Sequence, residues 1–131
     1  MTYVIVGAGP AGVVAAETLR TVDPAGEVVL IGAETDPPYG RMAIPYLLSG
    51  RISEQGTYLR KEDGHFEHRD ITYFQGNVTR VSPEDKTLTL DGGATQSYDK
   101  LLIATGAVPI QPPIADLDQP GIHHCWTLED A

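Results

Sequence analysis

The chain has 131 residues, 41% of them hydrophobic, which suits one globular domain with a real core. Its formal net charge of −9 argues against nucleic acid as a partner, because neutralising phosphates requires clustered Lys and Arg. No apolar run approaches the roughly 20 residues of a membrane span, and the N-terminus lacks a signal-peptide pattern, so we expect a cytoplasmic protein with no membrane partner.

The first 32 residues predict a β-α-β unit. Tyr3–Val6 is β-branched and aromatic and predicts a strand, and residues 10–22 predict a helix. The apolar residues at helical spacing are Ala11, Val14, Ala15 and Leu19. The letters DPAG end the helix, and EVVLIG at 27–32 predicts a strand of the continuously apolar kind that parallel sheets bury on both faces.

Three glycines join the first strand to the helix in a G-x-G-x-x-G pattern. In a dinucleotide-binding turn, Gly7 allows the tight turn, Gly9 lets the backbone approach a pyrophosphate, and Gly12 lets helix and strand pack closely. The helix N-terminus adds unpaired N–H groups, although Pro10 removes one of them. A plain tight turn is the alternative.

Glu34 follows the second strand, 22 residues after Gly12. This is close to the spacing at which an acidic side chain accepts hydrogen bonds from an adenosine ribose. A solvated loop carboxylate is the alternative, and Thr35 and Asp36 are lesser candidates. The combination predicts a dinucleotide site without deciding between a nicotinamide and a flavin.

The remaining chain does not continue the alternation of helices and parallel strands. Short strand-like runs predict an antiparallel meander inserted as the crossover, and they lie at Thr72–Phe74, Val78–Val81, Thr87–Leu90 and Ser97–Tyr98. The polar segment 61–70 predicts one short helix, with His65 and His68 on a solvated face. The apolar run at 98–110 then predicts a strand that ends in small residues, where a flat cofactor can approach the backbone.

The glycine fingerprint, Glu34, PPYGR at 37–41 and YDKLLIATGA at 98–107 together resemble the FAD-binding half of the pyridine nucleotide-disulfide oxidoreductase family. The resemblance spans essentially the whole chain. Within that family the chain is most similar to the ferredoxin, rubredoxin and nitrite reductase branch. It implies an α/β fold: a Rossmann-like FAD/NAD(P)-binding domain with a parallel sheet and an antiparallel β-meander crossover.

The resemblance also implies which residues bind FAD. Gly7, Gly9, Pro10 and Ala11, with Gly12 completing the fingerprint, would surround the pyrophosphate, while Glu34 and Thr35 would bind the adenosine ribose. Further along the chain, Arg41 would lie near pyrophosphate and flavin, Val78 would contact adenine through its backbone, and Ala104, Thr105 and Gly106 would line the centre of the cofactor. A surface ion pair is the alternative for Arg41, and a core valine is the alternative for Val78.

Departures from the family pattern narrow the chemistry. Met42, Ala43 and Ile44 stand where disulfide reductases carry reactive cysteines, and the only cysteine, Cys125, cannot form an internal disulfide or a paired-thiol centre. Tyr46 stands where related members place a lysine near the flavin. The letters HHCW at 123–126 lack the ligand spacing of known metal sites, so no metal is assigned. No residue is assigned a catalytic role.

These features lead us to expect a single FAD-binding domain over residues 1–131, a fragment without the NAD(P)H-binding and C-terminal interface domains of the family. In the full-length enzyme NAD(P)H would reduce FAD, which would pass electrons to a redox protein or reductase subunit. By itself the chain would not complete hydride transfer. An NAD-binding domain of a dehydrogenase and a catalytically silent fragment remain alternatives. An unpaired sheet edge predicts possible homo-oligomers.

Overall fold

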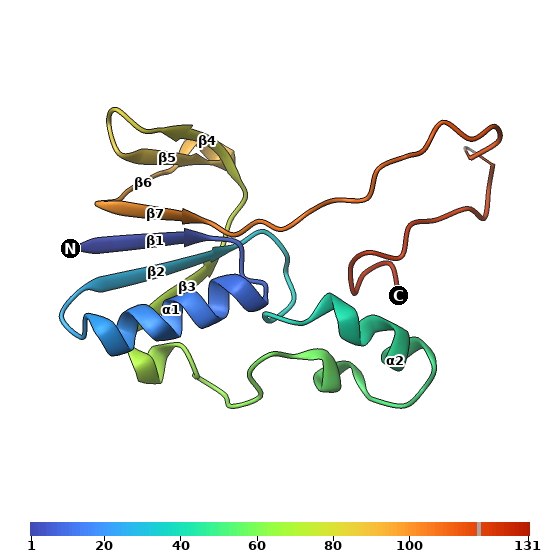
Figure 1. Cartoon of the computed structure of the whole chain (residues 1–131), viewed down its shortest axis with the longest axis horizontal. Coiled ribbons are helices and arrows are strands. Elements are labelled where there is room, and N and C mark those ends of the chain that lie inside the picture. The colour runs from blue at the N-terminus through green and yellow to red at the C-terminus, as the bar shows by residue number, and fades with distance from the viewer. Residues whose placement is uncertain (118) are drawn as a thin grey trace.

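The computed structural model describes residues 1–117 and 119–131. In them a parallel sheet lies between a helix on one face and a smaller antiparallel sheet on the other (Figure 1). The larger sheet is parallel, with strand order β3-β2-β1-β7, and the smaller is antiparallel, with order β4-β5-β6. The helices and strands are β1 Thr2–Val6, α1 Pro10–Val22, β2 Glu27–Gly32, α2 Ile44–Leu48, β3 Ile71–Gln75, β4 Val78–Ser82, β5 Thr87–Leu90, β6 Thr95–Ser97 and β7 Lys100–Ile103. The expected α/β class with an antiparallel meander is confirmed.

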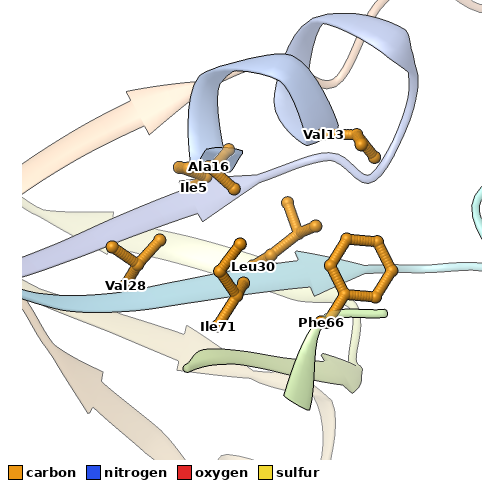
Figure 2. Close-up of a cluster of buried hydrophobic side chains, with 7 residues drawn as sticks. All are labelled: Ile5, Val13, Ala16, Val28, Leu30, Phe66 and Ile71. Carbon is orange, nitrogen blue, oxygen red and sulfur yellow. The ribbon is translucent and has the colours of Figure 1, made fainter. Parts of the chain in front are cut away.

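Both faces of the parallel sheet are covered, because successive side chains of a strand point to opposite faces. On one face a core cluster forms against α1 and is shown in Figure 2: Ile5, Val13, Ala16, Val28, Leu30, Phe66 and Ile71. On the other face a second cluster packs against the meander: Val4, Val6, Val29, Ile31, Leu88 and Leu90. This two-sided burial explains the continuous apolar runs in the sequence.

The buried face of α1 differs from the expected one. Ala11 and Val14 are exposed, whereas Gly12, Val13 and Ala16 are buried. Gly12 faces the turn before the helix, where a Cβ would lie 1.8 Å from the Gly7 carbonyl oxygen, and the neighbouring Val13 belongs to the same core cluster as Ile5. Ala15 and Leu19 pack at the edge of the same cluster.

The run at Thr72–Phe74 was expected to open the meander, and this expectation is wrong. It forms β3, which pairs with β2 in parallel, with Phe74 opposite Ile31. Ile71 is buried against α1, while Phe74 packs against the meander cluster, so this strand has a covered face on each side. The meander begins only after Gly76-Asn77, and its last strand lies at Thr95–Ser97 rather than Ser97–Tyr98.

The polar segment 61–70 holds no α-helix, and one short 3₁₀ turn, Glu67–Arg69, stands in its place. Gly64 has φ +68°, a conformation that interrupts a right-handed helix. His65 is buried rather than solvated, and its Nε2 lies 2.7 Å from Glu17 Oε1 of α1. Arg60 also donates two hydrogen bonds of 2.6 Å to Glu17, so this carboxylate ties the segment to α1.

The strand β7 pairs with β1 on one side, and no strand of the described residues pairs with its other side. Leu102 and Ile103 are exposed there. Within the part of the chain that the structure describes, no helix combines the length and apolarity needed to cross a bilayer.

Candidate functional site

The turn between β1 and α1 is built on the close approach of backbone atoms. Gly7 has φ +110°, and a Cβ placed on it would lie 2.3 Å from the carbonyl oxygen of Ala104. A Cβ on Gly12 would lie 1.8 Å from the carbonyl oxygen of Gly7. Neither distance tolerates a side chain. These two positions therefore need glycine for packing within the fold.

Gly9 is the exception among the three glycines. Its backbone is extended, with φ −75° and ψ −176°, which any residue can adopt. A Cβ on Gly9 would have no neighbouring atom within 4 Å. The space above Gly9 is therefore open, and the fold itself does not explain the glycine at this position.

The first turn of α1 begins directly after this open position. Gly9 is the N-cap residue, Pro10 occupies the first turn, and no side chain caps the helix. No acidic residue lies in the first turn either. Backbone N–H groups at a helix N-terminus carry partial positive charge and favour an anion.

At the carboxyl end of β2, the side chain of Glu34 is held by two neighbours. Its Oε1 pairs with the guanidinium of Arg41, and its Oε2 accepts a hydrogen bond from the hydroxyl of Tyr39. Burial, followed by the hydrogen bond to Glu34, raises the pKa of Tyr39 to about 12. The Glu34 carboxylate is thus fixed in place while remaining one-third exposed.

The C-terminal end of the chain, red in Figure 1, returns to the two side chains that hold Glu34. Arg41 Nε donates a 3.0 Å hydrogen bond to the carbonyl of Trp126, and its guanidinium carbon lies 4.7 Å from the centre of the Trp126 ring. The backbone N–H of Leu128 donates to the Tyr39 hydroxyl at 3.2 Å.

Two hollows lie beside these groups. A cavity of about 200 Å³ is lined by Ala33, Glu34, Thr35, Asp36, Thr127 and Glu129. A larger cavity of about 600 Å³ includes Asp36, Tyr58, Arg60, His65 and Tyr73 in its lining. Thr35 and Asp36 line both cavities, whereas Glu34 lines only the smaller one.

The other predicted residues are placed as follows. Ala104 contacts Gly7 and donates its N–H to Val6 at 2.7 Å, and Thr105 and Gly106 are exposed just beyond it. Ala11 is exposed on the first turn of α1. Val78 opens β4, and its partly buried side chain packs against the core cluster under the meander.

Two features of the site were not assigned from the sequence. Tyr39 stood inside the PPYGR motif, and its distance of five residues from Glu34 was the available signal. Trp126 is 85 residues from Arg41, and no spacing rule connects them. Among the described residues, no group of three or more His, Cys, Asp or Glu side chains is disposed to hold a metal ion.

Comparison with known proteins places this geometry in a family. The family model described as pyridine nucleotide-disulphide oxidoreductase matches residues 1–131. The ferredoxin–NAD(+) reductase component of the 3-phenylpropionate/cinnamic acid dioxygenase of Photorhabdus laumondii is 36% identical over 132 residues, covering 99% of this chain and 33% of that protein. The nitrite reductase [NAD(P)H] of Bacillus subtilis is 34% identical over 128 residues, covering 97% of this chain and 16% of that protein.

A solved structure gives the same result for the fold. The ferredoxin reductase for the CYP199A2 system of Rhodopseudomonas palustris superimposes with a TM-score of 0.88 at 28% identity, covering 98% of this chain and 32% of that one. The chain spans about a third or less of the length of these relatives. Together with the glycine turn, the match over the whole sequence shows that the chain belongs to the pyridine nucleotide-disulphide oxidoreductase family.

Proposed function

We propose that this chain is the FAD-binding module of an NAD(P)H-dependent flavoprotein reductase. One observation carries the proposal. Gly9 faces open space at an uncapped helix N-terminus, between two glycines that the fold itself requires. The packing of the fold does not require glycine at position 9. A ligand that must approach the backbone closely there would require it.

The residues present fit such a cofactor. Seen along the carboxyl ends of the parallel strands, the Glu34 carboxylate lies at the end of β2, the glycine turn at the end of β1, and Ala104-Thr105-Gly106 at the end of β7. A dinucleotide laid across this edge would meet a ribose acceptor, a diphosphate cradle and a small-residue strand end in that order. The exposure of Thr105 and Gly106 leaves the last of these accessible.

Each group then has a defined task. The open backbone at Gly9, Pro10 and Ala11 receives the diphosphate, with Gly7 and Gly12 shaping the turn, while Glu34 accepts hydrogen bonds from ribose hydroxyls beside Thr35. Arg41 contributes by holding Glu34 and supplies positive charge near the phosphates. The backbone of Val78 is proposed to contact adenine, while its partly buried side chain packs against the core cluster under the meander.

When bound, FAD supplies hydride acceptance and electron transfer, and the chain contributes position and electrostatics. One G-x-G-x-x-G fingerprint binds one dinucleotide, so we assign NAD(P)H to a different site of the intact enzyme. The electron acceptor is proposed to be a redox protein or reductase subunit. Relatives named as reductase components of ferredoxin-dependent systems, such as the Photorhabdus laumondii protein, support this class of partner.

Competitive titration tests the choice of cofactor. The purified protein is titrated with FAD, followed by flavin fluorescence, in the presence and absence of excess NAD⁺. We expect saturable FAD binding that millimolar NAD⁺ does not displace. Binding of NAD⁺ with no FAD binding would instead identify the nicotinamide-binding domain of a dehydrogenase, and binding of neither would identify a silent fragment.

A further inference from the structure

The C-terminal turn, residues 126–130, is held together by its own hydrogen bonds. The backbone N–H groups of Trp126 and Thr127 both donate to Asp130 Oδ2 at 2.8 Å, and the N–H of Asp130 donates to Thr127 Oγ1 at 3.3 Å. The bonds from these backbone groups lower the pKa of the Asp130 carboxyl, which keeps it in the accepting form. The turn is therefore a defined unit.

Two contacts join the C-terminal turn to the loop that follows β2. Trp126 holds the guanidinium of Arg41 through its carbonyl, at 3.0 Å, and through its ring, at 4.7 Å. Leu128 donates its N–H to the hydroxyl of Tyr39 at 3.2 Å. The turn thus contacts two side chains, one cationic and one neutral.

Both contacts lead to the same carboxylate. Arg41 pairs with Oε1 of Glu34, and Tyr39 donates to Oε2. An ionised carboxylate has about four acceptor positions, so these two partners leave room for ribose hydroxyls as further donors. The orientation of Glu34 is then set by Arg41 and Tyr39, and their orientation is set in turn by Trp126 and Leu128.

We propose that Trp126 is a positioning residue for the dinucleotide site, which acts through Arg41 on the carboxylate of Glu34. The inference rests on the proposed function, because it takes Glu34 as the ribose acceptor. It goes beyond that function by making the C-terminal turn part of the binding site. A nucleotide that donates hydrogen bonds to Glu34 changes the bonds between Glu34 and Arg41. Nucleotide binding and the position of the C-terminal turn therefore influence each other reciprocally.

The physical basis is the mobility of arginine. An arginine side chain loses much conformational freedom when it is held in one geometry. The Trp126 ring and carbonyl fix the guanidinium before any ligand arrives. Without the ring, Arg41 samples other positions and the Glu34 carboxylate is less often in the arrangement that receives ribose, which lowers the apparent affinity.

The first arm of the test needs no ligand. Trp126 is the only tryptophan of the chain, so emission excited at a wavelength that the six tyrosines do not absorb reports on it alone. We expect Glu34→Gln and Arg41→Lys to change the emission of Trp126, because each alters the cation held against its ring. Glu84→Gln, which removes an exposed carboxylate from the turn after β4, is the matched control and should leave the emission unchanged. Equal emission from all four proteins would overturn the inference.

The second arm measures FAD affinity by flavin fluorescence in a double-mutant cycle. Trp126→Leu should weaken FAD binding about three- to tenfold, the effect of losing a partly exposed cation–π contact. Trp126→Phe keeps an aromatic face and should recover part of the loss. In a Glu34→Gln background, Trp126→Leu should have little further effect, because its action passes through Glu34.

The outcomes separate this inference from the proposed function. If the wild-type protein binds FAD and Trp126→Leu weakens binding equally in both backgrounds, Trp126 is only a structural residue and the inference is wrong while the proposed function stands. If the wild-type protein binds no FAD, the proposed function and the nucleotide-linked part of the inference fail together, whatever the ligand-free fluorescence shows.

Discussion

Gly12 and Gly7 touch across the turn between β1 and α1, with no space between them for a side chain. A Cβ on Gly12 would come within 1.8 Å of the Gly7 carbonyl oxygen. This contact sets how closely the helix lies against the sheet. The neighbouring Gly9 has no such contact. Packing within the fold therefore requires glycine at positions 7 and 12 but does not require it at position 9.

This difference predicts losses of stability of unequal size from the same substitution. Gly12→Ala should destabilise the protein by about 3 kcal/mol or more, because overpacking against the backbone outweighs the better helix propensity of alanine. Gly9→Ala should cost about 1 kcal/mol or less, the effect of a less favoured N-cap. Urea unfolding of both variants checks this, and equal stability of the two would contradict the assigned roles.

The pH dependence of stability should report on Glu17. Its hydrogen bond from Arg60 is the main cause that lowers the pKa of Glu17 from 4.5 to about 2. A depressed folded-state pKa contributes stability above pH 4.5 that is lost as the pH falls toward 2. The loss should be about 2 kcal/mol, which is less than the full shift implies because the Glu17 side chain is still 23% exposed to water.

Urea unfolding between pH 7 and pH 2.5 measures this contribution. Glu17→Gln should be less stable than the wild type at pH 7, and the two proteins should converge as the pH falls. Glu84→Gln removes an exposed carboxylate of the same charge and is the control, with no convergence expected. A gap between wild type and Glu17→Gln that stays constant down to pH 2.5 would rule out the proposed role of this ion pair.

Tyr39 should affect the folding stability of the protein at alkaline pH. Burial and its bond to Glu34 raise its pKa from 10.0 to about 12, so the stability it contributes is present below pH 10 and is lost as the pH rises toward 12. Tyr39→Phe should cost about 1–2 kcal/mol at pH 8, since it leaves the N–H of Leu128 and the Glu34 carboxylate without this partner. The cost should shrink by pH 11.5.

Unfolding at pH 8 and pH 11.5 checks the prediction for Tyr39. Tyr46→Phe removes an exposed hydroxyl from α2 and serves as the control, with little change expected at pH 8. No loss for Tyr39→Phe at pH 8 would mean that the hydroxyl does not link Glu34 to Leu128.

The sequence predicted the parts of this fold whose signals are local. The strand at Tyr3–Val6, the helix at 10–22 and the strand at 27–32 follow from residue pattern, and the glycines mark the turn between them. The position of Glu34 just after β2 follows from chain order alone. Each of these depends on neighbours within a few residues.

The errors arose where distant contacts decide the structure. Residues 71–75 join the parallel sheet because Ile71 and Phe74 find apolar partners on its two faces, and a short alternating run does not reveal which sheet it will enter. His65 is buried because Glu17, 48 residues away, bonds to it. The ring of Trp126 reaches Arg41 across 85 residues for the same kind of reason.

The affinity of the Gly9→Val variant for FAD tests the central claim most directly. A Cβ at this position meets no atom within 4 Å, and the open space above Gly9 is where we place the diphosphate. Flavin fluorescence gives the affinity, and thermal unfolding of the same samples shows that the variant is folded. We predict saturable FAD binding by the wild type and at least about a tenfold loss in folded Gly9→Val. Equal FAD affinity of the two folded proteins would contradict the account.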